Sequence, residues 1–131
     1  MILLDTHVLL WLAAEPARLS RRASAAIRRG LRAGGIAIAS ISLWEIAMMF
    51  SDGRLRSRGT IEASIESLIR GTGVTLREIT PAVAALATQF PAEFPADPAD
   101  RLIAATAREG GLSLVTKDER IRSSPLIRTI W

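Results

Sequence analysis

The chain has 131 residues, of which 49% are apolar, and this is enough to bury the core of one domain. Seventeen basic and 13 acidic side chains leave a net charge of +4, and every basic residue except Lys117 is an arginine. Because the chain has no cysteine and only one histidine, His7, it excludes a disulfide scaffold, a thiolate zinc site, an iron–sulfur cluster and a multi-histidine metal site.

The first predicted element is a buried strand over residues 2–4, an apolar run that Asp5 closes. Residues 6–14 predict a short apolar helix that stops at Glu15-Pro16. In residues 18–33, apolar side chains recur every four positions through Leu31, and six arginines fall on the opposite side within a sector of about 120°. This stretch is expected to be one helix with a packed face and an arginine stripe from Arg18 to Arg32.

Strands and helices alternate along the rest of the chain. The expected strands are 36–39, 74–79, 112–115 and a short last one at 127–130; the expected helices are 42–50, 60–70, 80–89, one that follows the loop 90–98 and runs to 109, and 119–122. This order predicts a single domain over residues 1–131, an α/β fold of three layers (α/β/α) with a central, mostly parallel sheet of four to five strands.

Most of the aspartates fall where strands end or helices begin. Asp5 ends the first strand, Asp118 follows a later strand, Glu45 lies in the first turn of a helix, and Asp97 and Asp100 flank another helix start. Ligands of open α/β sheets bind at the carboxyl ends of the strands, so these acids can converge at one edge. Clustered carboxylates without histidine or cysteine favour a hard cation such as Mg²⁺ or Mn²⁺.

Helix capping is the alternative explanation for several of these acids. Ser42 and Glu45 match a capping box, Asp97 precedes Pro98 as an N-cap would, and Asp118 can cap residues 119–122. Asp5 has no such explanation, because a carboxylate at the end of a buried strand is costly unless it is compensated.

Four blocks of sequence resemble a known family. They are residues 3–7 (Leu-Leu-Asp-Thr-His), 40–47 (Ser-Ile-Ser-Leu-Trp-Glu-Ile-Ala), 97–107 (Asp-Pro-Ala-Asp-Arg-Leu-Ile-Ala-Ala-Thr-Ala) and 114–119 (Leu-Val-Thr-Lys-Asp-Glu). In this order and spacing, the chain resembles a PIN-domain ribonuclease and, more narrowly, a VapC-type toxin of a bacterial type II toxin–antitoxin pair. One departure is Pro95-Ala96, where the family often has His-Gly or His-Arg before the Asp-Pro step.

The resemblance implies a catalytic site and partners. The site would have Asp5, Glu45, Asp100 and Asp118 holding one or two Mg²⁺ or Mn²⁺ ions, Thr116 orienting the water or a phosphate oxygen, Thr6 holding the Asp5 carboxylate from behind, and Asp97 mainly capping. A metal-activated water would cleave RNA endonucleolytically and leave 5′-phosphate and 3′-hydroxyl ends. A cognate antitoxin, a homodimer and a hetero-oligomer with the antitoxin are the expected assemblies.

Other conspicuous residues have a functional and a structural interpretation. Arg54, Arg56 and Arg58 are candidates for contact with RNA or a partner, Arg101 for such a contact or for anchoring a carboxylate, and the arginine stripe for RNA, antitoxin or solvent alone. Trp11 and Trp44 are expected in the core or at an interface rather than as platforms for stacked bases, and His7 is expected to pack or to form a hydrogen bond rather than to act as a general base.

Two other functions stay open at this point. One is a nuclease of the same fold that acts in RNA maturation or on DNA without an antitoxin; the other is a non-catalytic module that binds an acidic partner. No GxGxxG or Walker A loop follows a predicted strand, which excludes the common nucleotide-binding motifs. The longest uncharged stretch, residues 79–92, is too short to span a bilayer, and residues 1–14 lack the basic start of a signal peptide, so a cytoplasmic protein with no membrane contact is expected.

Overall fold

A computed structural model describes all residues from Met1 to Trp131. Its sheet has five strands in the order β3-β2-β1-β4-β5, and every pairing is parallel. The strands are β1 (Ile2–Leu4), β2 (Ile36–Ala39), β3 (Thr75–Arg77), β4 (Leu114–Val115) and β5 (Thr129–Ile130). The predicted α/β class and the upper end of the predicted strand number are confirmed.

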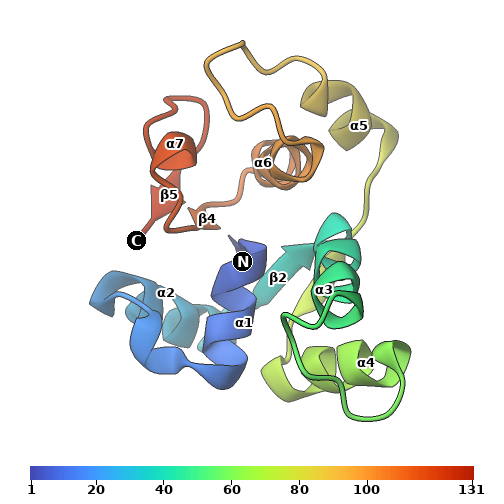
Figure 1. Ribbon diagram of the computed structural model, residues 1–131. Helices are drawn as coiled ribbons and strands as arrows, with labels where there is room; N and C mark the ends of the chain where they lie inside the picture. Colours follow the sequence, from blue (N-terminus) through green and yellow to red (C-terminus); the bar gives the residue numbers. More distant parts are fainter.

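Helices occupy both faces of this sheet. They are α1 (Thr6–Ala14), the short 3-10 helix η1 (Pro16–Arg18), α2 (Arg21–Arg32), α3 (Ile41–Ser51), α4 (Ile61–Thr72), α5 (Pro81–Ala87), α6 (Pro98–Gly110) and α7 (Glu119–Arg122). In Figure 1, α5, α6 and α7 lie on one side of the sheet, α1, α2 and α4 lie on the other, and α3 runs beside β2. None of these helices has the length and apolar character needed to cross a bilayer.

The side chains of successive strand residues point to opposite faces of the sheet, so the core consists of two clusters. Leu3 of β1 and Leu114 of β4 pack with α5 and α6, whereas their neighbours Leu4 and Val115 pack with α1 and α2. All four side chains are fully buried. Successive strand residues point to opposite faces, so apolar runs of this kind occur where both faces are covered.

The segment predicted as one helix over residues 18–33 is interrupted. The 3-10 helix η1 ends at Arg18, and Ser20 caps α2, its hydroxyl accepting a hydrogen bond from the Ala23 amide at 3.0 Å. Arg18 therefore lies outside the helical arginine stripe. Leu31, expected on the packed face, is 54% exposed, and Gly30 is the buried residue of that turn.

Several predicted strands are shorter in the structure than in the sequence pattern. The strand expected at 112–115 begins only at Leu114, because Gly111 has a left-handed backbone (φ 63°) and the Leu112 amide bonds back to the Ala107 carbonyl. This helix-terminating turn leaves Leu112 outside the ladder, whereas the Ser113 carbonyl still accepts from the Leu3 amide at 3.0 Å. It also sets where β4 starts, and so where β4 delivers Thr116 and Asp118.

Candidate active site

The central strands β1 and β4 bring two of the predicted acids to the same edge of the sheet. Leu4 is paired with Val115, and the Asp5 amide donates to the Val115 carbonyl at 3.0 Å, so Asp5 and Thr116 leave adjacent strands side by side. Asp118 follows two residues later at the start of α7. Parallel pairing thus joins positions that are more than a hundred residues apart in the chain.

Asp5 is held at both carboxylate oxygens. Its Oδ1 accepts from the Thr6 amide at 2.8 Å, and its Oδ2 accepts from the Thr116 hydroxyl at 2.7 Å. Burial raises the pKa of Asp5 above its ordinary value, while the hydrogen bonds from Thr116 and Thr6 oppose that rise. The carboxylate is therefore fixed in orientation and poorly solvated.

Glu45 reaches the same region from α3. The Thr6 hydroxyl oxygen lies 2.6 Å from Glu45 Oε1 and 2.8 Å from Ser42 Oγ. A hydroxyl has one proton, so the chain of bonds runs from Ser42 through Thr6 to the carboxylate. Burial raises the pKa of Glu45, the Thr6 hydrogen bond lowers it, and repulsion from Asp5 and Asp97 raises it further.

This geometry shows that the predicted capping box is wrong. The N-cap of α3 is Ser40, whose side chain makes no capping bond, and Ser42 is buried inside the first turn. Ser42 faces Thr6 across the site instead of bonding the Glu45 side chain. Glu45 is consequently free to take part in the acidic cluster.

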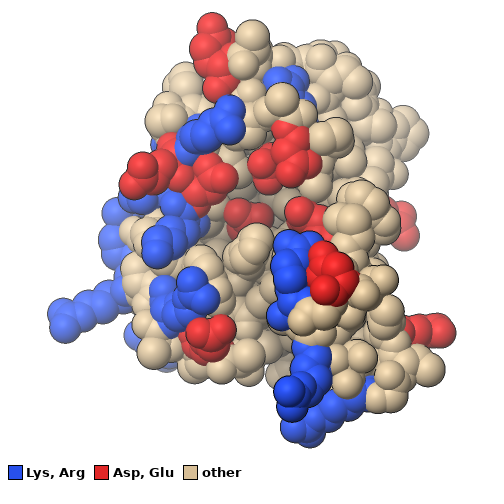
Figure 2. All heavy atoms as spheres, in the orientation of Figure 1, with Lys and Arg blue, Asp and Glu red and all other residues tan.

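Asp100 is another member of the cluster with a strongly raised pKa. Burial, followed by repulsion from Asp97, Asp5, Asp118 and Glu45, raises its pKa from 3.8 to about 7. The structure therefore brings together all five predicted acids as one electrostatic group. Figure 2 shows acidic side chains around a hollow near the middle of one face, with many basic side chains on the left and lower parts of the same face.

The predicted caps at Asp97 and Asp118 are confirmed. Asp97 Oδ1 accepts from the Ala99 amide at 2.9 Å, and Asp118 Oδ1 accepts from the amides of Arg120 and Ile121 at 2.9 and 3.1 Å. In both residues the capping bonds use only Oδ1. Capping and membership of the acidic cluster are therefore compatible, because each carboxylate keeps its second oxygen.

The donor set of the cluster fits a hard divalent cation. None of the four ion pairs in the structure includes Asp5, Glu45, Asp97, Asp100 or Asp118, so no arginine or lysine neutralises the cluster directly. All its donors are oxygens, which Mg²⁺ and Mn²⁺ prefer. In this structure no three of these carboxylates lie close enough together to hold a metal ion.

Two threonines have contacts that differ from those expected. Thr6 meets Asp5 through its backbone amide, whereas its hydroxyl serves Glu45. Thr116 is fully buried, donates its single proton to Asp5 and accepts from the Asp118 amide at 3.1 Å. Its hydroxyl proton is therefore committed to positioning Asp5, and the predicted contact with water or phosphate would have to use its remaining lone pair.

Arg101 does not anchor a carboxylate. Its guanidinium donates to the carbonyl oxygens of Pro95, Phe90, Pro91 and Phe94 at 2.8 to 3.3 Å. These bonds tie the loop before α6 to the first turn of that helix, beside Asp97 and Asp100. Arg101 is a structural clamp on this loop, which also explains why its donors are unavailable for a partner.

We expect Arg101→Met to lower the free energy of unfolding by about 1–3 kcal/mol, because it leaves the loop carbonyls without their donor. Urea unfolding checks this, with the exposed Arg120→Met as a matched control that should change little. Equal unfolding midpoints for both variants would contradict the clamp.

The three arginines at positions 54, 56 and 58 do not share one location. Arg54 pairs with Asp52 at 2.9 Å, and nearby Glu45 contributes to raising the pKa of Arg54. Arg56 and Arg58 line a separate hollow among α1, α2 and α4, whose lining contains none of the clustered acids. Only Arg54 therefore lies near the predicted cleft.

Ser42 is the site residue whose role the sequence did not reveal. It lies three positions before Glu45, a spacing that also fits a capping box, and no local pattern distinguishes the two arrangements. Its burial and its bond to Thr6 depend on α1 and α3 meeting in the fold.

Comparisons with known proteins agree on one family. The PIN domain matches residues 2–125. Ribonuclease VapC22 of Mycobacterium tuberculosis is 44% identical over 135 residues, covering 99% of this chain and 98% of that protein. Among solved structures, VapBC2 from Rickettsia felis bound to a promoter DNA fragment has a TM-score of 0.73 at 16% identity, covering 98% of this chain and 97% of that one. DNA-bound VapBC from Salmonella typhimurium has a TM-score of 0.70 at 22% identity over 98% and 97% of the two chains.

Proposed function

The chain belongs to the PIN domain family, and from this premise we propose that it is a metal-dependent endoribonuclease acting as the toxin of a bacterial toxin–antitoxin pair. The carrying observation is a cluster of five carboxylates without a paired cation, which follow β1 and β4 or lie on α3 and at the start of α6. The similarity to a VapC ribonuclease along the whole chain supports RNA as the substrate.

Asp5, Glu45, Asp100 and Asp118 would hold Mg²⁺ or Mn²⁺. When bound, such an ion supplies Lewis-acid polarisation of the scissile phosphate and a lowered pKa for the attacking water. The chain itself contributes orientation: Thr116 and the Thr6 amide fix Asp5, and the Thr6 hydroxyl fixes Glu45. Because water is the attacking group, no histidine pair is needed to activate a ribose hydroxyl.

The proposed activity is tested with purified protein and labelled RNA. Cleavage should require added Mg²⁺ or Mn²⁺ and should stop with EDTA. Growth arrest on expression, relieved by the neighbouring antitoxin, identifies a toxin. Cleavage of DNA alone, or activity without growth arrest, would instead indicate a maturation or DNA nuclease, and binding of an acidic partner without any cleavage would indicate a non-catalytic module.

We expect Thr6 to support catalysis by holding the Glu45 carboxylate in place. Thr6→Val keeps the shape of the side chain but removes the hydroxyl, and we expect RNA cleavage to fall about 10–100-fold, the usual loss for a group that orients a metal ligand. The control is Thr106→Val, since Thr106 is equally buried but donates to the Leu102 carbonyl within α6. An equal loss of activity in the two variants would show that Thr6 acts only through stability.

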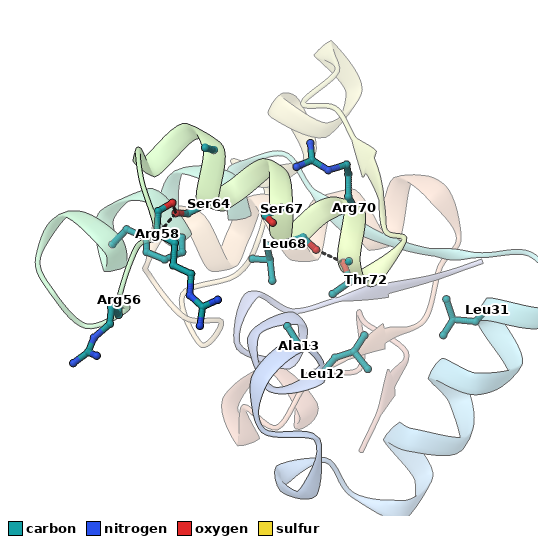
Figure 3. A pocket seen from close by; sticks show the side chains of 13 residues that line it. Leu12, Ala13, Leu31, Arg56, Arg58, Ser64, Ser67, Leu68, Arg70 and Thr72 are labelled. Carbon is teal, nitrogen blue, oxygen red and sulfur yellow. Dashed lines mark hydrogen bonds between the residues drawn. The ribbon is translucent and has the colours of Figure 1, made fainter.

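The antitoxin is proposed to dock in the hollow among α1, α2 and α4, which has a volume of about 750 Å³ (Figure 3). Its apolar lining includes Leu12, Leu31, Phe50 and Leu68, and its basic lining is Arg56, Arg58 and Arg70. In Figure 3, Arg58 points into the hollow, whereas Arg56 points away from it. Apolar walls with cationic groups favour an amphipathic acidic segment.

We therefore expect Arg58→Glu to weaken antitoxin binding by about tenfold or more while the free toxin keeps its RNA cleavage, because reversing this charge repels an acidic segment. Calorimetric titration with the antitoxin measures the change. Arg28→Glu, on the exposed face of α2, is the matched control. Similar weakening by both variants would assign binding to the overall charge instead of to the hollow.

A homodimer and action in the cytoplasm complete the proposal. The dimer is proposed from the resemblance to VapC-type toxins, and Trp44 on α3, a residue that is 58% exposed, is the candidate contact between the two copies. Light scattering of the free protein tests the assembly.

A further inference from the structure

A hollow of about 460 Å³ borders the carboxylate cluster and has no role in the proposed chemistry. Its lining includes His7, Trp11, Lys117, Asp118, Arg122 and Trp131. Asp118 belongs to both sites, and His7 follows Thr6 in α1, so the two sites are continuous. The volume lies within the range of about 300–1,000 Å³ that is usual for pockets that bind small molecules.

Three aromatic rings form the organic part of this hollow. The Trp11 ring lies in the middle, 6.1 Å from His7 and 5.8 Å from Trp131 between centroids, with the planes tilted by 49° and 58°. Neither pair is stacked in parallel, so neither His7 nor Trp131 covers a whole face of the Trp11 ring. Both tryptophans pack partly against the core and remain partly exposed, so Trp11 is more than the packing residue expected from the sequence.

Cations are arranged around the central ring. Lys117 Nζ lies 5.9 Å from the Trp11 centroid and lines the hollow, whereas the Arg18 guanidinium lies 4.6 Å from that centroid and does not line it. Arg122 adds a second exposed cation to the lining. Aromatic faces beside flexible cations are the usual combination for single-stranded nucleic acids, in which bases stack and phosphates meet lysine or arginine.

The acids in the lining select against a purely anionic occupant. Asp118 and Glu119 both border the hollow. An acidic peptide or a free phosphate would meet these carboxylates directly, whereas a nucleobase is neutral and can donate its amino or imino hydrogens to them. A base stacked on one indole and contacting the edge of the other would leave its flanking phosphates with Lys117 and Arg122 on one side and with the carboxylate cluster on the other.

We propose that this hollow binds one unpaired base of the RNA, packed against Trp11 and Trp131, next to the phosphodiester that is cleaved. This inference deepens the proposed function and rests on it for the identity of the nucleic acid. RNA is favoured over a protein segment because the hollow opens onto the carboxylates, where a phosphate is expected. A base held there would position the backbone over the cluster.

The test measures binding separately from cleavage. Asp100→Asn protein, which keeps the lining intact, is titrated with a single-stranded oligoribonucleotide and with the same oligonucleotide carrying one abasic site, and tryptophan fluorescence is followed. We expect quenching by the intact strand and about tenfold weaker binding of the best-placed abasic strand. Trp131→Leu should weaken binding similarly, and Trp11→Phe should remove most of the quenching.

Trp44→Phe is the matched control, because Trp44 lies on α3 and does not line the hollow. It should keep both the affinity and the quenching. Phenylalanine is chosen at position 11 because it keeps an aromatic ring packed against the core. Unfolding midpoints show that each variant is folded. Unchanged affinity and quenching in both Trp131→Leu and Trp11→Phe would overturn the base site. Variants that bind an acidic peptide more weakly but bind RNA as before would also overturn it. Base-dependent quenching without any cleavage by the parent protein would overturn the proposed activity instead.

Discussion

Asp100→Asn is expected to reduce RNA cleavage by more than about 100-fold, and Asp5→Asn to do the same, since even groups that only orient metal ligands account for about 10–100-fold. Burial and the repulsion of four other carboxylates raise the pKa of Asp100 to about 7, and Asp5 is held at both of its oxygens. An amide keeps the size of each side chain but loses the charge that attracts the cation. Single-turnover cleavage of a labelled RNA measures the loss.

The matched control for this pair is Asp52→Asn. Asp52 pairs with Arg54 in an exposed turn outside the cluster, so this variant should cleave like the parent. An Asp100→Asn protein with the parent's rate would remove Asp100 from the site. Full activity of Asp5→Asn would show that the end of β1 is not where the chemistry occurs.

The second large effect is on the free energy of unfolding, which we expect a rise in pH to lower and a bound metal ion to raise. Asp100 is protonated in the folded chain up to about pH 7 but ionises near its ordinary pKa of 3.8 when unfolded, so the folded state binds more protons between these values. Stability without metal should therefore fall as the pH rises from about 4 to 7. Burial raises the pKa values of Asp5 and Glu45 in the same direction.

The contribution of Asp100 to this fall is about 1–2 kcal/mol after allowance for solvent screening of a half-exposed group. Mn²⁺ or Mg²⁺ at a hundredfold excess over its dissociation constant should add about 2.7 kcal/mol at pH 8, which is above the raised pKa of Asp100. Urea unfolding at a series of pH values, with and without the ion, measures both effects.

Asp100→Asn should flatten the metal-free profile and lose most of the gain from Mn²⁺, whereas Asp52→Asn should preserve both. If the free energy of unfolding of the parent rose from pH 4 to 7 relative to that of Asp100→Asn, the carboxylates would not repel one another as the account requires. Equal stabilisation of parent and Asp100→Asn by Mn²⁺ would place the ion elsewhere.

The sequence was informative wherever a local pattern coincided with a strand end. An apolar run closed by Asp5, and another followed by Thr116 and Asp118, are sufficient to predict β1, β4 and the meeting of their carboxyl ends. Asp97 and Pro98 likewise predict the start of α6 because a cap and a proline at the first position act within one turn.

Local sequence patterns did not predict the interactions between distant segments. The bond from Thr6 to Glu45 joins α1 to α3, and the four bonds of Arg101 depend on the path of a loop that has no repeating pattern. The break at Ser20 had a capping signal, but the apolar spacing on either side masked it. Trp11 was assigned to packing because a helix of uniform apolarity does not show which ring remains partly exposed.

The chemistry of the cleaved ends tests the central claim most directly. RNA is cut by the purified protein with Mn²⁺, and the 5′ ends of the products are sequenced by a method that requires a 5′-phosphate. A carboxylate site that directs water to the phosphorus predicts 5′-phosphate and 3′-hydroxyl ends, formed only with the divalent ion and lost in Asp100→Asn. Products with 5′-hydroxyl and 2′,3′-cyclic phosphate ends, formed equally well in EDTA, would contradict it.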